Sequence, residues 1–482
     1  MDIYDLLIVG GGINGAAIAR DAAMRGKTVL LVEKDDLAQH TSSASSKLIH
    51  GGLRYLEYYE FRLVREALKE REILLRTAPH IVTPLRFVLP HGEGMRPWWM
   101  LRAGLRLYDL LAWGGSLPRS RSAKDGTFSS PLKPQARAAL ATYWDAWVDD
   151  ARLVVLNAIA AAEQGAKIAT RTELLSAQRV GERWQARLSD GRTIDAAAIV
   201  NAAGPWVADV LGRLCENSAS RVRLIKGSHI VVPRLYAGDH AYILQQPDGR
   251  VIFVLPYGER SLVGTTDIPV ERPEEAVISA DEIAYLCAAV NLYFERQTLP
   301  TDVIWSYSGV RSLYDDGATA AQSVTRSYRL ELDDDPGAQL LSVFGGKITT
   351  ARALAEEAVG LLGMTGPSGT RHAFLPGGEM NADRGGFEEL SAQLKLWMPE
   401  DLLDRLHRQY GARLRDVVGN ASSLDGLGRH YGAGLYEAEV RYLREREFAQ
   451  TAEDILWRRT KLGLRMQKAD ADALNAALHG PS

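Results

Sequence analysis

Three glycines near the start of the chain have the spacing of a phosphate-binding turn. Gly10, Gly12 and Gly15 follow the apolar run 6–9 and open the segment 13–24, in which small apolar residues recur at helical intervals. Glycine lets the backbone turn sharply and approach a pyrophosphate, whose charge is stabilised by the N–H groups and positive dipole end of a helix. The pattern predicts a strand, a tight turn and a helix that bind a phosphate group.

An acidic residue follows at the end of the next expected strand. Residues 28–32 are apolar and end at Glu33, at the distance from the glycines expected of an acid that binds both ribose hydroxyls. Together these residues predict a parallel βαβ unit that binds a dinucleotide. The simpler alternative is a structural turn beside a solvated glutamate.

Two further segments combine glycine with polar side chains. Residues 41–46 hold five hydroxyl side chains in six positions, and residues 47–55 add Lys, His, two adjacent Gly, Arg and Tyr. Such a loop can lie along a flat cofactor and direct charge at a substrate, although a solvated serine-rich loop has the same composition. Residues 345–350 stand between an expected strand and an expected helix, whose N-terminal dipole can stabilise negative charge. A plain turn with an exposed lysine is the alternative there.

The composition excludes several classes of protein. Of the 482 residues, 46% are hydrophobic and 24% are charged, as in an ordinary globular protein. A net charge of −3 provides no field for a polyanion, so we expect no nucleic-acid partner. Cys215 and Cys287 are far apart, which fits a reducing compartment and predicts no metal centre. Without a signal peptide or a run of roughly 20 apolar residues, any membrane contact is expected to be peripheral.

The elements that must position these residues indicate an α/β fold with a second sheet and a helical end. Apolar runs at 195–201 and 340–344 end in glycine-rich turns, which places them in the parallel sheet with the first strands. Runs rich in β-branched residues predict a mostly antiparallel sheet from residues 81–88, 222–232, 241–246, 250–255 and 261–265. Residues 61–77 have the spacing of an amphipathic helix, and Thr451 and Asp454 form a capping box for a helix through Leu464.

These elements suggest where the domains begin and end. We expect a discontinuous dinucleotide-binding domain (1–75, 150–221 and 305–363), a substrate- and membrane-facing domain (76–149 and 222–304), a linker (364–386) and a C-terminal helical domain (387–482).

Several motifs together resemble the FAD-dependent, aerobic glycerol-3-phosphate dehydrogenase family. They are the glycine fingerprint and residues 42–57, 147–152, 201–206, 226–229, 264–267, 307–311 and 344–347, and the match continues to 457–461. The resemblance implies a Rossmann-like FAD-binding domain with a parallel sheet and an antiparallel substrate domain of the D-amino-acid-oxidase superfamily type. It also implies oxidation of sn-glycerol 3-phosphate to dihydroxyacetone phosphate, with electrons passed to a membrane quinone.

The resemblance further implies roles for individual residues. FAD would be contacted by Gly10, Gly12, Asn14, Gly15, Glu33, Thr41, Ser42, Ser46, Lys47, Leu48, Gly204, Gly346 and Thr349. A phosphate dianion needs fixed positive charge, which Arg54, Arg326 and Lys347 can supply, with Tyr55 as a neutral donor. Arg326 could equally be a surface arginine.

The catalytic residues expected from the resemblance are His229, Arg311 and Lys347. Hydride can leave the carbinol carbon only as the hydroxyl loses its proton, so a base is useful, and His229 is the candidate. Its alternative is a histidine packed within a strand. Arg311 would lie near the reacting carbon.

A basic, aromatic segment suggests contact with an anionic lipid surface. Residues 95–124 contain three tryptophans and six basic side chains against one acid, Asp109. A helix over 98–113 would be partly buried in the membrane interface, with its arginines reaching water and with Trp98, Leu101 and Leu105 among its lipid contacts. A helix buried between domains is the alternative.

Two other functions remain open from the sequence. One is a soluble glycerol-3-phosphate oxidase that gives electrons to oxygen, and the other is a non-catalytic FAD-binding protein. The expected location is the cytoplasm, peripheral on the inner face of the cytoplasmic membrane. The sequence leaves the oligomeric state open, with a homodimer as one option.

Overall fold

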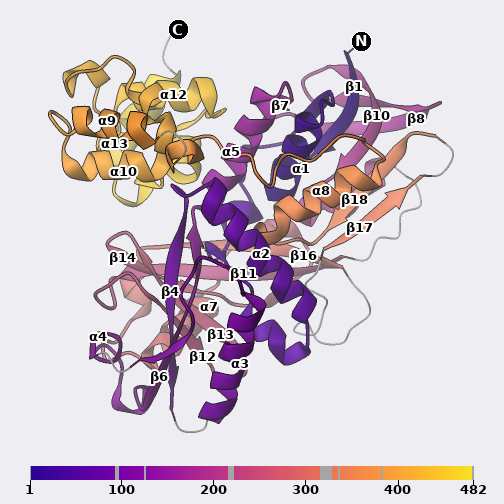
Figure 1. Ribbon diagram of the computed structural model, residues 1–482. Coiled ribbons are helices and arrows are strands. Elements are labelled where there is room, and N and C mark those ends of the chain that lie inside the picture. Colours follow the sequence, from indigo (N-terminus) through magenta and orange to yellow (C-terminus); the bar gives the residue numbers. More distant parts are fainter. Residues whose placement is uncertain are drawn as a thin grey trace.

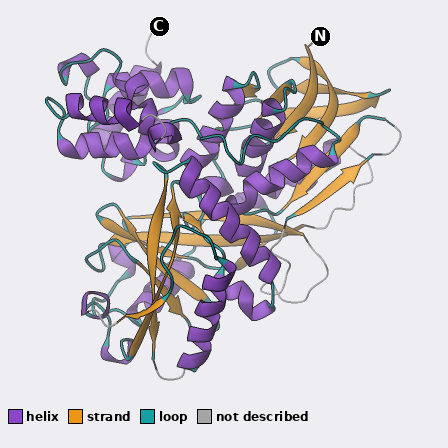
Figure 2. Ribbon diagram, in the orientation of Figure 1, coloured by secondary structure: helices purple, strands orange, loops and turns teal. Residues whose placement is uncertain are grey.

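The fold combines two β-sheets with a separate group of helices (Figure 1, Figure 2). A computed structural model describes residues 2–92, 97–123, 126–214, 222–314, 328–334, 337–381 and 384–479. The chain starts in the first sheet, crosses repeatedly into the second and ends in the helices (Figure 1).

The first sheet is built around five parallel strands. Their order is β18 (Gln339–Phe344), β10 (Thr193–Asn201), β1 (Asp2–Val9), β2 (Val29–Val32) and β7 (Lys167–Ala169). The antiparallel strands are β17 (Arg329–Asp333) beside β18 and the hairpin of β8 (Leu174–Val180) and β9 (Arg183–Leu188) beside β10. The predicted βαβ unit and the predicted placing of 195–201 and 340–344 in this sheet are confirmed.

Both faces of this sheet are buried, which explains its nearly continuous apolar strands. Because successive side chains point to opposite faces, Leu6 and Ile8 of β1 pack in one core and Leu7 and Val9 in another. The first core also contains residues of α1 (Ile13–Met24), α5 (Asp150–Glu163) and α8 (Ala351–Leu361), and the second contains residues of α6 (Val207–Leu214). The helices hold the glycine turn rigidly at the carboxyl end of β1.

The second sheet is antiparallel except for the pairing of β12 with β4, in agreement with the expected mostly antiparallel sheet. Its order is β15 (Ile268–Val270), β11 (Val222–Pro233), β14 (Arg260–Gly264), β13 (Val251–Tyr257), β12 (Ala241–Gln245), β4 (Val82–His91), β6 (Ala139–Val148) and β3 (Leu48–Ile49). β5 (Arg121–Ala123) pairs with β6. The helix α7 (Ala280–Asn291) packs with one of its cores, and α2 (Phe61–Thr77) and α3 (Trp98–Leu111) with another.

One strand of the second sheet was not predicted from the sequence. β16 (Trp305–Tyr314) belongs to the stretch 305–363, which we expected in the dinucleotide-binding domain, but it pairs with β11 in the second sheet. Its antiparallel register with β11 runs over ten residue pairs, from Val222–Tyr314 to Val231–Trp305. The cavity described below is consequently walled by both sheets.

The C-terminal helices form their own apolar core, as predicted. They are α9 (Arg384–Leu394), α10 (Glu400–Tyr410), α11 (Leu414–Val418), α12 (Glu437–Arg446) and α13 (Lys468–His479). The capping box is present, since Thr451 Oγ1 accepts the Asp454 N–H at 3.2 Å and the Asp454 carboxylate accepts the Thr451 N–H at 3.0 Å.

The helix that this box opens is shorter than expected and has a different hydrogen-bond pattern. It is a π-helix over Asp454–Arg459, and it ends five residues before Leu464. Thr460 explains the ending, because both its N–H and its hydroxyl donate to the Ile455 carbonyl, and Lys461 then turns the chain with a φ of +59°.

The basic, aromatic segment also differs from expectation. α3 ends at Leu111, its residues Leu105 and Tyr108 are buried, and Trp98 and Leu101 pack against the same core. Leu105 therefore faces the protein and not lipid, whereas Trp98 and Leu101 are only partly buried. None of the helices in the described part of the chain has the length and hydropathy of a membrane span.

Candidate active site

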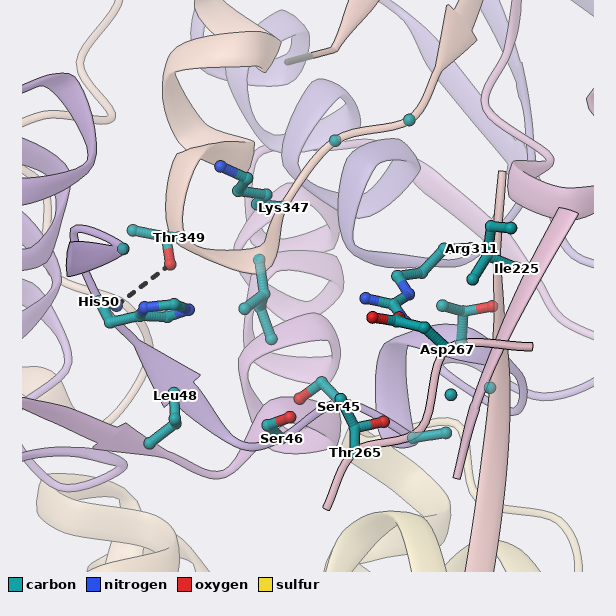
Figure 3. A pocket seen from close by; sticks show the side chains of 18 of the residues that line it. Ser45, Ser46, Leu48, His50, Ile225, Thr265, Asp267, Arg311, Lys347 and Thr349 are labelled. Atoms are coloured by element: carbon teal, nitrogen blue, oxygen red, sulfur yellow. Dashed lines mark hydrogen bonds and ion pairs between the residues drawn. The ribbon is translucent and has the colours of Figure 1, made fainter. Parts of the chain in front are cut away.

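A cavity of about 1480 Å³ lies where the two sheets meet. Sites for small ligands usually occupy about 300–1,000 Å³, so this cavity has room for a dinucleotide together with a small substrate. Figure 3 shows part of it, with Lys347 and His50 on one side and Arg311 and Asp267 opposite.

The glycine turn at one end of the cavity is closely packed. Gly10 has a φ of +113°, and a Cβ on Gly15 would stand 1.9 Å from the Gly10 carbonyl oxygen, so that α1 could not approach β1 with a larger residue there. Gly12, the N-cap of α1, offers no side-chain acceptor to the helix. The turn therefore presents backbone N–H groups and the positive helix end to the cavity.

Glu33 is oriented by the backbone. Its carboxylate accepts the N–H of Gly11 at 2.6 Å and that of Asp35 at 2.9 Å, and it lines the cavity while being almost completely buried. Burial raises the pKa of this carboxyl group, although the two N–H donors oppose that effect. The arrangement fits a carboxylate that receives hydroxyl donors from a ribose.

The hydroxyl-rich loop ties the glycine turn to the second sheet. Ser42 Oγ accepts the N–H of Ile13 at 3.0 Å, in the first turn of α1, and Thr41 Oγ1 donates to the Val310 carbonyl at 2.6 Å. The loop thus spans the cavity from α1 to β16.

Lys47, which was expected to contact the cofactor, lies outside the wall of the cavity. Its Nζ donates to the Asp150 carboxylate at 2.7 Å and to the Ser43 carbonyl at 3.1 Å, and the side chain is fully buried. Lys47 does not line the cavity, because Asp150, which also accepts the Ser45 hydroxyl, holds it behind the loop. Its positive charge still acts on the site from a short distance.

His229 lies on β11 and faces the cavity. Its Nε2 and the Ser46 hydroxyl form a hydrogen bond of 2.9 Å, its ring stacks on Tyr307 at 4.8 Å, and its Nδ1 has no partner among the described residues. Burial, together with the positive charges of Lys47 and Arg311, lowers the pKa of His229 to about 3. The imidazole is therefore neutral at pH 7, and it is a weak proton acceptor as long as no anion in the cavity opposes these two charges.

Arg311 on β16 is paired with Asp267, which follows β14. Both side chains line the cavity, and the ion pair directs the guanidinium across it. Asp267 was not among the residues expected in the site.

Two further cations face the cavity near the 3₁₀ helix η2 (Leu53–Tyr58). Lys347 lies 3.9 Å from the centre of the Tyr55 ring, and its Nζ is buried without a hydrogen-bond partner in the described part of the chain. Arg54, the neighbour of Tyr55, lines the cavity and forms no ion pair within the residues that the structure describes. These unpaired positive charges can receive an anion.

Most of the predicted site residues come together at this cavity. Those that line it are Gly10, Gly12, Asn14, Glu33, Thr41, Ser42, Ser46, Leu48, Arg54, Tyr55, Gly204, His229, Arg311, Gly346, Lys347 and Thr349. Gly15 packs behind the turn, and Arg326 lies outside the described residues.

His50 is a cavity residue that the sequence did not single out. Its backbone N–H lies 3.4 Å from Thr349 Oγ1, and its ring points into the cavity in Figure 3. The only signal was its place next to the paired glycines Gly51 and Gly52, inside a loop already expected to be functional.

A glycine turn at the end of β1, an acid at the end of β2 and a cavity between two sheets define a dinucleotide-binding oxidoreductase fold. A family model described as FAD dependent oxidoreductase matches residues 5–361, and one described as the C-terminal domain of alpha-glycerophosphate oxidase matches residues 368–479.

Curated relatives and a solved structure agree with this class. The chain is 53% identical to a D-erythritol 1-phosphate dehydrogenase of Brucella abortus (97% of this chain, 96% of the relative) and 52% identical to a glycerol-3-phosphate dehydrogenase of Pseudomonas aeruginosa (96% and 92%). The structure of a glycerol-3-phosphate dehydrogenase from Bacillus halodurans complexed with FAD has a TM-score of 0.72 at 24% identity (98% of this chain, 93% of that chain). This chain belongs to the FAD-dependent glycerol-3-phosphate dehydrogenase family.

The cofactor is FAD, and the residues present fit it. Gly10 and Gly12 line the cavity without a side chain that would block a pyrophosphate, and Glu33 is held for a ribose. Asn14 Oδ1 is buried beside Gly346 without a partner in the described residues. Whether each of these residues contacts FAD stays a prediction.

Proposed function

We propose that this FAD-dependent enzyme oxidises sn-glycerol 3-phosphate at its secondary hydroxyl, which gives dihydroxyacetone phosphate. The observation that carries the proposal is the pair of cations, Arg54 and Lys347, that line the cavity and form no ion pair with a carboxylate of the described residues. The names of curated relatives, among them glycerol-3-phosphate dehydrogenases at 46–52% identity, support the same substrate.

The two cations suit a phosphate dianion. A guanidinium forms paired charge-assisted hydrogen bonds with phosphate oxygens, and an ammonium group adds a point charge. The Tyr55 ring beneath Lys347 steers the ammonium without neutralising it, so the full charge remains for the ligand. Arg326 remains a predicted third cation.

The substrate must lose a proton from its hydroxyl and a hydride from the same carbon. Bound FAD supplies the two-electron acceptor for this oxidation. We assign the proton to His229, whose imidazole is neutral and whose Nδ1 has no partner in the described part of the chain. A phosphate dianion in the cavity opposes the charges of Lys47 and Arg311, which raises the basicity of His229 when substrate binds.

Arg311 is proposed to stabilise the charge that develops on the substrate oxygen. As the hydroxyl loses its proton, negative charge grows on the oxygen, and a fixed guanidinium stabilises that charge. The ion pair with Asp267 holds the Arg311 side chain in position before substrate arrives, so little reorganisation is needed during the reaction.

The acceptor of the electrons is proposed to be a membrane quinone. The cavity reaches Tyr59 and Met100, which are both exposed at its edge, and Trp99, Leu110 and Trp113 of the same region are exposed too. An apolar rim at the cavity mouth fits a lipid-soluble acceptor and a peripheral position on an anionic membrane surface, on its cytoplasmic side. An oxidase would instead release hydrogen peroxide, which a peroxidase-coupled assay detects.

A second candidate substrate follows from the comparisons. The D-erythritol 1-phosphate dehydrogenase is as similar to this chain as the glycerol-3-phosphate dehydrogenase, at 53% against 52% identity. The longer polyol phosphate would use the same cations and the same base.

Steady-state kinetics with a soluble dye as acceptor separate the candidates. We expect kcat/KM for sn-glycerol 3-phosphate to exceed that for D-erythritol 1-phosphate at least tenfold, with no turnover of glycerol or a D-amino acid. A reversed order would assign the four-carbon substrate, and turnover of the D-amino acid alone would contradict both proposals.

A further inference from the structure

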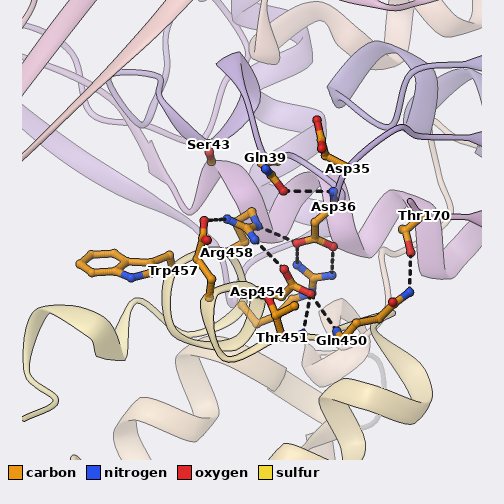
Figure 4. Close-up of polar contacts among 12 residues, drawn as sticks. Asp35, Asp36, Gln39, Ser43, Thr170, Gln450, Thr451, Asp454, Trp457 and Arg458 are labelled. Carbon is orange, nitrogen blue, oxygen red and sulfur yellow. Dashed lines mark hydrogen bonds and ion pairs between the residues drawn. The ribbon is translucent and has the colours of Figure 1, made fainter. Parts of the chain in front are cut away.

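The C-terminal helical domain reaches the cofactor loop through a buried ion cluster (Figure 4). Asp36, fully buried, accepts Nε of Arg458 at 2.6 Å and two donors of Arg459 at 2.8 Å each. The two arginines come from the π-helix, and Asp36 comes from the loop that follows β2.

Asp36 stands in the middle of the loop that shapes the FAD site. Three residues before it, Glu33 accepts the N–H of Gly11, and six residues after it, Ser42 accepts the N–H of Ile13. Between them the Ala38 N–H donates to the Gly11 carbonyl at 3.1 Å. A shift of Asp36 would therefore move contacts on both sides of the glycine turn.

The arginines are themselves held in place. Asp454 accepts a donor of Arg458 at 2.6 Å, one of Arg171 at 2.7 Å and the backbone N–H groups of Gln450 and Thr451. The wider turn of the π-helix lets the consecutive Arg458 and Arg459 reach the same carboxylate. The cluster is thus a fixed anchor and not a flexible surface pair.

The same segment also touches the other wall of the cavity. Trp457 stacks on Trp305 at 4.6 Å, and Trp305 begins the strand that carries Tyr307, the ring under His229. Nζ of Lys461 lies 4.0 Å from Asp149, which caps α5, whose first residue Asp150 pairs with Lys47. One C-terminal segment therefore contacts the supports of both the cofactor loop and the catalytic histidine.

We propose that Arg458 and Arg459 are positioning residues for FAD, through which the C-terminal domain fixes the loop from Glu33 to Ser46. The inference depends on FAD binding and not on which polyol phosphate is oxidised. On this proposal the C-terminal helical domain contributes directly to cofactor binding.

The test compares Arg459→Gln with Arg405→Gln as a matched control. Arg405 forms an equally close ion pair with Glu439 at 2.7 Å, but that pair lies wholly within the C-terminal helices. Apoprotein of each variant is titrated with FAD and followed by fluorescence, and its thermal unfolding is measured without FAD. The visible circular dichroism of the reloaded holoenzyme reports the orientation of the bound flavin.

We expect Arg459→Gln to raise the Kd for FAD about tenfold or more and to change the visible circular dichroism, because a buried carboxylate loses two charge-assisted hydrogen bonds. Arg405→Gln is expected to lower the unfolding temperature with an unchanged Kd. The proposal is overturned if the two variants shift the Kd equally, or if Arg459→Gln lowers only the unfolding temperature.

Arg458→Gln is the second variant, for the case that Arg459→Gln does not fold. It leaves both Arg459 hydrogen bonds to Asp36 in place. We expect a smaller rise in the Kd, of about threefold, with the substrate KM measured at saturating FAD unchanged. An unchanged Kd in this variant would also overturn the proposal.

Discussion

Arg54 offers a prediction at the scale of one residue, because it faces the cavity without an ion-pair partner in the described chain. Arg54→Ala removes one charge-assisted contact to the phosphate, which costs about 1.5–3 kcal/mol and should raise KM by about 10- to 100-fold. FAD content should stay at the wild-type level, since the glycine turn and Glu33 are unchanged. The measurement is dye-linked kinetics together with the absorbance ratio of flavin to protein.

Arg62→Ala serves as its control, because Arg62 is an exposed arginine of α2 that does not line the cavity. KM should be unchanged in that variant. A loss of FAD from Arg54→Ala in step with the rise in KM would contradict a role in phosphate binding.

The proton acceptor can be identified by comparing two histidines that both line the cavity. If His229 is the base, His229→Ala should slow flavin reduction by about 10²-fold or more, whereas His50→Ala should have a smaller effect. Stopped-flow mixing with saturating substrate under nitrogen measures this rate. The reverse order of effects would assign the proton to His50, and an unchanged rate in the His229 variant would remove it from the mechanism.

Single residues were predictable where backbone geometry demands a residue type. Gly10, Gly15 and Glu33 follow from the shape of a βαβ turn, which local sequence determines. Lys47 and His50 illustrate the limit, because their roles depend on Asp150 and Thr349, partners that lie about 100 and 300 residues further along the chain. No spacing rule indicates such contacts.

Among the helices and strands, α3 has an exposed side whose contact with a membrane surface can be tested. Trp99 and Leu110 of α3, and Trp113 just after it, are exposed, so replacing all three by Ser should reduce sedimentation with phosphatidylglycerol vesicles and slow quinone reduction, with dye-linked activity intact. Added salt should weaken the binding that remains, because basic residues contribute about 1 kcal/mol each near an anionic surface.

Two controls define what this experiment measures. Leu396→Ser removes an apolar side chain that is 85% exposed in the C-terminal helices and should leave sedimentation unchanged. Leu105→Ser, on the buried side of α3, should destabilise the protein by about 2–5 kcal/mol. Wild-type sedimentation of the triple variant would show that the membrane contact is elsewhere.

Elements with strong apolar periodicity were predictable, and those set by distant partners were not. The sequence predicted α2 over the same residues 61–77, because its apolar pairs recur at helical intervals up to Pro79. The π-helix could not be predicted, because a capping box specifies where a helix starts and not its hydrogen-bond pattern. The strand β16 was not predicted, because its pairing with β11 depends on tertiary contacts that the local sequence does not specify.

The whole molecule should lose stability on mild acidification. Burial and the nearby Arg152 lower the pKa of His80 to about 3, and burial with Lys47 and Arg311 lowers that of His229 to about 3. Both side chains bind a proton in the unfolded chain near pH 6.5 but not in the folded protein, so stability is highest above pH 6.5 and falls as the pH decreases toward 3.

His80→Leu tests this dependence. The unfolding free energy of this variant is measured with saturating FAD between pH 7.5 and 5.5. It should change less steeply with pH than that of the wild type, because up to one proton fewer is taken up on unfolding. A slope identical to the wild type would show that His80 is not the group responsible.

We propose that the assembled molecule transfers electrons from a polyol phosphate to its own FAD. The direct measurement is to mix the purified holoenzyme with sn-glycerol 3-phosphate under nitrogen and to record the flavin absorbance. We expect rapid bleaching of the flavin, which glycerol and D-amino acids at equal concentration do not cause. An oxidised flavin spectrum that persists with sn-glycerol 3-phosphate and D-erythritol 1-phosphate alike, in protein that contains FAD, would contradict it.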